Sequence, residues 1–454
     1  MSASTESGGL ARAIGGKMLI VFIVGDILGA GIYALVGKLS GLVGGMIWLP
    51  LAIGFSVAAL TAGSYAELVG KYPKAAGAAL YTHRAFGKPF ITFLVAFAVM
   101  MSGIASASAA ALAFGGRYLT VFFPDSPTLL AAYGFLGAVT IVNFLGVSES
   151  VKVNLVLTVV EVTGLLIVIV VGVIGIARGE GDTSRAFTLE APDGALLGVL
   201  GATALGFYAL IGFEDSVNLA EETEEPSRTF PRALFTGIAI TGVVYVVIAF
   251  IAVTLVPPGT LAKSSGPLLE VVSAAGVQFP PKLFAIIALL AIGNTALINM
   301  MMASRLLYGM ANEKIVPAAL AKVHSGRRTP IVAIGFTVLI SFALITYGRY
   351  SADAVRDLAD TTVLLLLLVF ALVNIAVLVL RDRPVDHAHY RTPTWIAVLG
   401  AATTLVLASP LTGRPGRIYV IAASLVGVGA VLWIINRLVT GRRVTELDAE
   451  QLSK

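Results

Sequence analysis

Three glycines and an aspartate interrupt the first long apolar stretch of the chain, in "GDILGAGIY" at positions 25–33. Glycine weakens a helix by about 1 kcal/mol relative to alanine, and a carboxylate at bilayer depth is also costly. A segment that only anchored a protein would avoid both. The carboxylate of Asp26 suits the binding of a proton or a cation, and a helix that restarts after Gly29 offers free N–H groups to an anion.

A second interruption of the same kind lies in "LGFYALIGFEDSVNLAEE", at positions 205–222. Gly206 and Gly212 break the apolar run, and Glu214 and Asp215 follow it. Either break alone is compatible with glycines that only allow close helix packing. Unwound backbone at the middle of a membrane survives only where it lines a cavity, however, so paired interruptions in two halves of a chain indicate an inverted-repeat transporter.

The composition is that of a chain made mostly of membrane helices. Of the 454 residues, 57% are hydrophobic and 13% are charged, and the mean hydropathy is +0.92. This excludes a water-soluble domain of similar size, which must cover itself with polar side chains. Cysteine is absent, so neither a disulfide framework nor a thiolate metal site is expected. The net charge is only +5, and the basic residues do not form the clustered basic face that nucleic-acid binding requires.

Apolar runs of about 20 residues, the length that spans a bilayer, recur along the whole chain. Twelve are expected, and the first and the sixth are broken and each open a block of five. The runs lie at 18–37, 44–69, 89–119, 128–147, 152–177, 196–220, 233–256, 282–310, 330–348, 356–380, 394–411 and 417–437. The sequence thus predicts an all-α polytopic membrane protein.

Domain boundaries and orientation follow from these runs. We expect a transport core of ten helices at 18–380 and a further helix pair at 381–437. A cytoplasmic segment, 1–17, precedes the core, and a cytoplasmic tail, 438–454, ends the chain. Most of the 31 lysines and arginines fall on one side of the predicted topology, which places both termini in the cytoplasm and the protein in the cell membrane.

Four ordered motifs resemble the amino acid–polyamine–organocation superfamily of permeases. "GAGIYALVG" at 29–37 is similar to the family's first-helix signature, and "YAELVGKYPKAAGAALYTHRAFGKP" at 65–89 to its loop between the second and third helices. "FYALIGFEDSVNLAEETEEPSRTFPRAL" at 207–234 resembles the sixth-helix motif. "SRLLYGMANEKIVPAALAKVHSGRRTPIVAI" at 304–334 resembles the end of the eighth helix and the segment that follows it.

The resemblance implies a LeuT-like fold, a five-plus-five inverted repeat that moves amino acids or related amines by alternating access. It also implies a substrate site at the two breaks. The break in the first helix would bind the substrate carboxylate, and the break in the sixth helix would bind the amino group through backbone carbonyls. An aromatic side chain of the sixth helix would close over the substrate, and the third helix would face it. The corresponding residues here are Ile27, Gly29, Ala30, Gly31, Ile32, Ser106, Phe207, Tyr208 and Leu210.

Two acidic residues depart from the family pattern. Asp26 stands where the family usually has a small or amide residue, and Glu161 stands where many members carry a lysine on the fifth helix. Two carboxylates in a site of low dielectric constant cannot both be ionised unless a cation lies between them. A proton, a sodium ion or a cationic substrate would satisfy them, and the proton is favoured. Asn294 and Thr295 on the eighth helix would add oxygen ligands for sodium. A protonated, purely structural Glu161 is the alternative.

Other polar residues of the membrane segments are expected to have structural roles. Glu67 and Arg305 lie near the cytoplasmic ends of helices, where we expect each to form an ion pair or to extend toward water. Asn299 is expected to connect neighbouring helices by hydrogen bonds.

The predicted function is secondary active transport of an amino acid, including a cationic one, coupled to protons. The four histidines fall in loops and no nucleophile or phosphate-loop motif is present, so an enzyme is not expected. A channel would need a continuous polar pore lining, whereas the polar residues here are concentrated at the two breaks, so a channel is not expected. The alternatives are transport of a polyamine or another organic amine, and an amino-acid sensor on the same scaffold. No cofactor is expected beyond the coupling ion, and the expected partners are the small-molecule substrate and the lipid bilayer.

Overall fold

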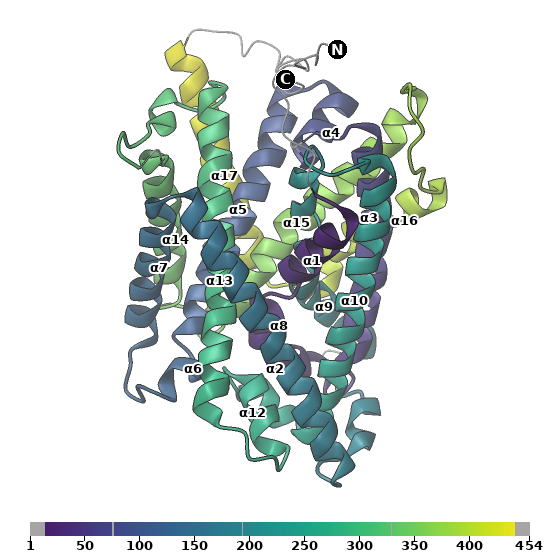
Figure 1. The fold of residues 1–454 in the computed structure, drawn as a ribbon, viewed down its shortest axis with the longest axis vertical. Coiled ribbons are helices and arrows are strands. Elements are labelled where there is room, and N and C mark those ends of the chain that lie inside the picture. Colours follow the sequence, from purple (N-terminus) through teal and green to yellow (C-terminus); the bar gives the residue numbers. More distant parts are fainter. Residues whose placement is uncertain (1–13, 75–76, 193, 328, 441–454) are drawn as a thin grey trace, which may run out of the picture.

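Long helices run roughly along one axis in the computed structural model, which describes residues 14–74, 77–192, 194–327 and 329–440 (Figure 1). Most of the predicted terminal segments, 1–17 and 438–454, lies outside these residues. Apart from two isolated β-bridges, the described residues form helices, turns and loops. The predicted all-α fold of a polytopic membrane protein is therefore confirmed.

Nine helices of the described residues are long and apolar enough to cross a membrane, and a bent helix pair adds a tenth span. The pair is α1 (Gly16–Ile27) and α2 (Ala30–Val43). The nine are α3 (Trp48–Lys71), α5 (Pro89–Phe114), α7 (Thr128–Leu145), α8 (Val147–Ala177), α9 (Ala195–Gly206, continued by short turns to Leu219), α10 (Pro226–Leu255), α13 (Pro281–Asn312), α15 (Ala354–Val379) and α17 (Gly416–Thr440). Two expected spans form shorter apolar helices, α14 (Ile331–Tyr347) and α16 (Thr394–Ala408). The count of twelve spans stays a prediction.

The first and the sixth apolar segments are both broken at their glycines. α1 and α2 meet at an angle of 44°, with residues 28–29 between them. In the sixth segment, α9 ends at Gly206 and a single turn of 3₁₀-helix, η2 (Phe207–Leu210), follows it. The chain is then extended at Ile211, and Gly212 has φ of +127°, which residues with a side chain rarely adopt.

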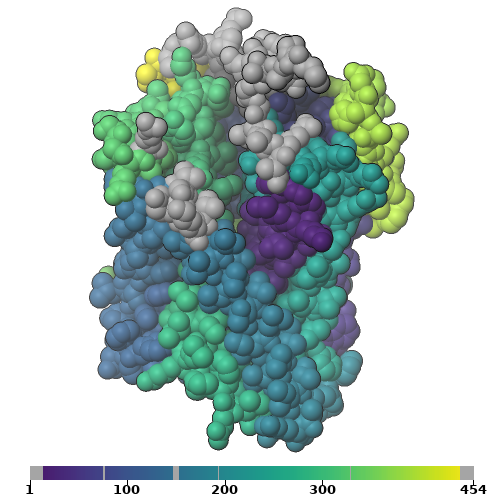
Figure 2. Space-filling view, in the orientation of Figure 1, coloured from purple at the N-terminus to yellow at the C-terminus, as the bar shows by residue number. Residues whose placement is uncertain are grey.

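Different short helices lie at the two ends of the molecule. At one end, α11 (Pro258–Lys263) and α12 (Pro267–Ala274) pack against α2, and at the other end α4 (Gly77–Phe86) packs against α5 and α15 (Figure 1). Between these ends, α1 packs on α10 and α8 and reaches the molecular surface (Figure 2). Met18 and Val21 on α1 are each 64% exposed. One half of the broken first helix is thus partly free of protein contacts.

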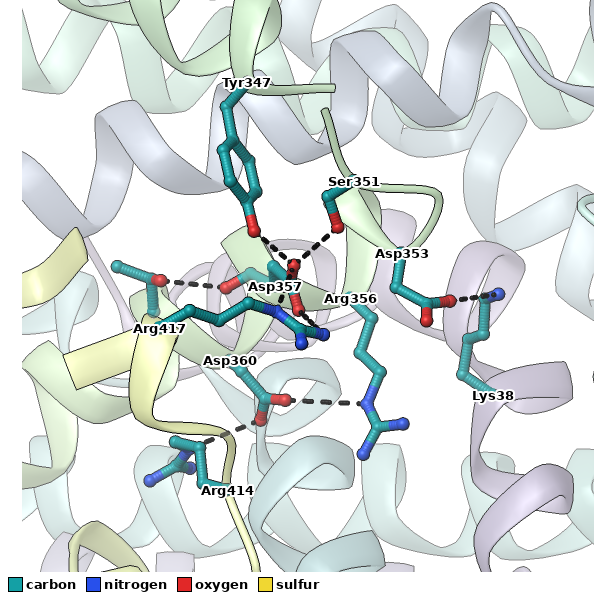
Figure 3. A network of polar contacts seen from close by, with 10 residues as sticks. Lys38, Tyr347, Ser351, Asp353, Arg356, Asp357, Asp360, Arg414 and Arg417 are labelled. Carbon is teal, nitrogen blue, oxygen red and sulfur yellow. Dashed lines mark hydrogen bonds and ion pairs between the residues drawn. The ribbon is translucent and has the colours of Figure 1, made fainter. Parts of the chain in front are cut away.

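A polar network ties α14, α15 and α17 together at the end of the molecule away from α4 (Figure 3). The buried carboxylate of Asp357 accepts hydrogen bonds from the Tyr347 hydroxyl at 2.7 Å and the Ser351 hydroxyl at 2.8 Å. Arg417 donates to the same carboxylate from two nitrogens, at 2.8 and 2.9 Å. A bidentate pair of this kind is strong because both partners are charged and geometrically matched.

Replacing Asp357 by asparagine is expected to lower the free energy of unfolding by about 2 kcal/mol, because the buried carboxylate loses charge-assisted hydrogen bonds while Arg417, whose side chain is 48% exposed, can be solvated. Asp353 is the matched control, since it pairs with Lys38 at 3.3 Å in the same region but its side chain is 49% exposed. Asp353→Asn should cost less than about 1 kcal/mol. Unfolding of the detergent-solubilised proteins measures both, and equal losses would contradict the assigned role of burial.

Candidate functional site

A cavity of about 350 Å³ joins the two broken segments. Its walls come from both breaks and from α3, α4, α5, α8, α13 and α15. The cavity extends from Ser106 and Thr295, beside the breaks, to the first turn of α4 and to Arg305 near the end of α13. It therefore leads from the middle of the helix bundle toward the α4 end.

The two breaks touch through their backbones. A Cβ atom added to Gly31 would lie 2.7 Å from the Cα of Ala209, and one added to Gly212 would lie 2.8 Å from the carbonyl oxygen of Asp26. Neither distance is compatible with a side chain. The glycines that were identified in the sequence are thus needed for the breaks to approach each other, in addition to ending the helices.

The start of α2 offers hydrogen-bond donors to the cavity. The N–H of Ala30 donates to the Thr295 hydroxyl at 2.9 Å. The N–H groups of Gly31 and Ile32 belong to the same first turn, where a helix has no internal acceptors for them. Across the break, the Tyr245 hydroxyl donates to the carbonyl of Ile27 at 2.7 Å and holds the end of α1. A helix start of this kind can bind an anionic group.

Two carboxylates on the cavity wall have an oxygen without a partner. Asp26 lies in the last turn of α1, and its Oδ2 forms no hydrogen bond with any described residue. Glu161 on α8 is 1% exposed; its Oε2 accepts from Asn294 at 3.2 Å, whereas its Oε1 has no partner in the same part of the chain. Asn294 also donates to the Thr158 hydroxyl at 3.1 Å. Buried oxygens without partners are costly, so this arrangement suits a proton or another cation.

A chain of polar contacts crosses the cavity from α13 to the sixth segment. Asn299 donates to the carbonyl of Thr295 at 2.9 Å and to the Ser106 hydroxyl at 3.5 Å. The hydroxyls of Ser106 and Tyr208 are 2.8 Å apart. Asn299 was expected only to connect helices, but it also lines the cavity. Tyr208 lines the cavity at the same place.

Three residues predicted for the site do not line the cavity. The buried ring of Phe207 packs on Phe370, with ring centroids 6.1 Å apart. Leu210 lies against Gly54 of α3, and Ile32 is 1% exposed within the helix core. Of the two candidate aromatic gates, the structure places only Tyr208 beside the cavity.

Sequence reasoning missed three charged residues of the cavity wall. Glu214 and Asp215 line it directly after the sixth break, and Glu214 accepts a hydrogen bond from the N–H of Gly212 at 2.9 Å. Both residues follow Gly212 within three positions, and this closeness to the break is the sequence signal that could have assigned them to the cavity. Arg305 was expected to pair or to extend into water, but it lines the cavity. Glu67, for which the same was expected, pairs with Arg381 at 3.3 Å as predicted.

Comparison with known proteins identifies the family. The sequence model described as amino acid permease matches residues 14–435. The chain is 27% identical to an uncharacterized transporter of Mycobacterium tuberculosis over 97% of this chain and 94% of that protein. It is 26% identical to a branched-chain amino acid permease of Bacillus subtilis over 85% of this chain and 84% of that one. A chloroplastic cationic amino acid transporter of Arabidopsis thaliana is 28% identical over 71% of this chain and 59% of its own. The chain therefore belongs to the amino acid permease family, whose members named here are transporters, and it is a multi-pass membrane protein of that kind.

Proposed function

We propose that this protein is a secondary active transporter that moves an amino acid across the cytoplasmic membrane by alternating access, driven by a proton gradient. One observation carries the proposal: the open N–H groups of α2 and the unpartnered carboxylate oxygens of Asp26 and Glu161 lie on one cavity between two broken helices. Broken helices at such a site bind charged solutes through their free backbone groups.

The closed end of the cavity supports an alternating-access mechanism. Toward α12, the Tyr33 hydroxyl donates to the carbonyl of Glu161 at 3.0 Å, and the Tyr118 hydroxyl donates to the carbonyl of Tyr33 at 2.9 Å. The cavity already extends to the α4 end, so a solute can pass between that end and the broken helices without breaking these contacts. If the α4 end is cytoplasmic, as the basic residues predict, this conformation is open to the cytoplasm. We infer that tilting of the lightly packed α1 takes part in closing it.

The substrate we propose is an amino acid, including one with a cationic side chain. Its carboxylate would bind at the start of α2, where Gly31 lines the cavity, and its amino group would bind carbonyls of the 3₁₀ turn beside Tyr208. Four carboxylates share the cavity wall: Asp26, Glu161, Glu214 and Asp215. They favour a side chain that carries positive charge. The named relatives include both a branched-chain and a cationic transporter, so they support an amino acid without specifying which one.

For the driving ion we propose a proton held by Asp26 and Glu161. Like charges in a low-dielectric cavity repel, so a proton shared by the pair allows both residues to stay buried. Sodium would need oxygen ligands from Asn294 and Thr295. Asn294 directs its amide nitrogen toward Glu161 and Thr158, and the hydroxyl of Thr295 accepts from Ala30, but Asn294 Oδ1 has no hydrogen-bond partner among the described residues. An oxygen ligand is thus available to sodium as well, and the proton is preferred because it needs only the two carboxylates.

An organic amine is the second candidate substrate, because an amine without a carboxylate would also be attracted by the four acids. Uptake into proteoliposomes of labelled arginine, lysine, alanine, γ-aminobutyrate and putrescine separates the two. With an inward gradient of one pH unit, we expect basic amino acids to accumulate up to about tenfold per coupled proton. If putrescine alone accumulates, the substrate is an amine and not an amino acid. If uptake needs sodium and not the pH gradient, the coupling ion is sodium and not a proton.

A further inference from the structure

Arg305 is a half-buried cation on the cavity wall. Within the described part of the chain, no hydrogen bond or ion pair reaches its guanidinium. Two other arginines in buried surroundings differ, since Arg381 and Arg414 both pair with carboxylates. A guanidinium taken partly out of water is costly unless an anion compensates it. A cavity is the place where a mobile anion can do so.

Arg305 is far from the start of α2. Thr295, which contacts the N–H of Ala30, and Arg305 are ten residues apart on α13, and at 1.5 Å per residue this is about 15 Å along the helix. That span exceeds the length of a single amino acid. Residues between the two, including Asn299 and Met302, line the same cavity. The two positions are therefore separate places along one path.

We propose that Arg305 forms a second subsite, which takes the carboxylate of the substrate between the broken helices and the α4 end. A guanidinium can bind a carboxylate through two parallel hydrogen bonds. Glu214, Asp215 and Asn218 line the same cavity from the sixth segment and can accept an ammonium group. The path thus offers both charges that an amino acid carries. This inference rests on the proposed amino-acid transport and adds a site to it.

Transport by wild-type protein, Arg305→Gln and Arg305→Lys in proteoliposomes provides the experiment. KM is measured separately from each side of the membrane, for the best amino-acid substrate and for the amine that lacks its carboxylate. For Arg305→Gln we expect KM for the amino acid to rise about tenfold at the α4 side and to change less than about twofold at the other side. KM for the amine should stay within about twofold, and Arg305→Lys should restore part of the affinity because it retains the charge.

The control is Lys322→Gln, which removes an exposed cation from the loop after α13 and should leave every KM unchanged. Equal increases for the amino acid and the amine would overturn the subsite, because a contact to the carboxylate affects only the former. Increases that are equal on both sides, or absent, would overturn it as well. If wild-type protein carries no amino acid, the proposed function fails and the subsite fails with it, whereas failure of the subsite alone leaves wild-type transport intact.

Discussion

Glu161→Gln is expected to abolish accumulation driven by a pH gradient and to keep part of the exchange of substrate for substrate. Glutamine preserves the size of the side chain and can accept from Asn294, as Glu161 Oε2 does at 3.2 Å. It cannot take up and release a proton. Exchange requires only binding and the change of conformation, whereas net accumulation requires the coupling ion. The accumulation ratio at one pH unit should fall from about ten to about one.

Asp26→Asn is expected to give the same result, because the two carboxylates face one cavity and a shared proton needs both. Accumulation ratios and exchange rates in proteoliposomes distinguish a loss of coupling from a loss of binding. Glu224→Gln serves as the matched control, since Glu224 is exposed and lies outside the cavity. Unchanged accumulation in both variants would show that Asp26 and Glu161 have structural roles only.

Gly31→Ala is expected to reduce the initial rate of uptake on the order of 100-fold, the loss that a displacement of about 1 Å causes at the active site of an enzyme. The added Cβ would lie 2.7 Å from the Cα of Ala209, which is backbone and cannot rotate away. The first and the sixth breaks must then move apart. Alanine stabilises a helix relative to glycine by about 1 kcal/mol, so the change itself does not weaken α2.

The control for this variant is Gly41→Ala in the same helix, where the added Cβ meets only Ala262 at an ordinary distance of 3.5 Å. Uptake by Gly41→Ala should remain close to that of the wild type. Surface expression and the elution profile in detergent must be equal for the two variants. Wild-type uptake by Gly31→Ala would mean that the breaks do not need their observed contact for transport.

The sequence alone was sufficient for the membrane fold and for the position of both breaks. Apolar length and the conformational freedom of glycine are local properties, so a run such as 18–37 and the glycines within it can be interpreted without knowing any neighbour. Asp26 was found in the same way, because a carboxylate inside an apolar run is costly wherever the helix packs. Glu161, in contrast, was singled out only by its alignment with a family position, and Asn294 was proposed as an oxygen ligand for sodium, whereas its amide nitrogen donates to Glu161.

Only the tertiary structure decided which neighbouring side chains reach the cavity. Phe207 and Tyr208 are adjacent aromatic residues with the same local signals, and the 3₁₀ turn that contains them directs one ring to Phe370 and the other to Ser106. The sequence was equally ambiguous about which charged residues near helix ends form ion pairs. Glu67 and Arg305 had equal reasons to form an ion pair, but the partner of Glu67, Arg381, comes from a segment about 300 residues away, and Arg305 meets none in the described chain. Pairing depends on which distant segments pack together, and packing is not a property of any local stretch of sequence.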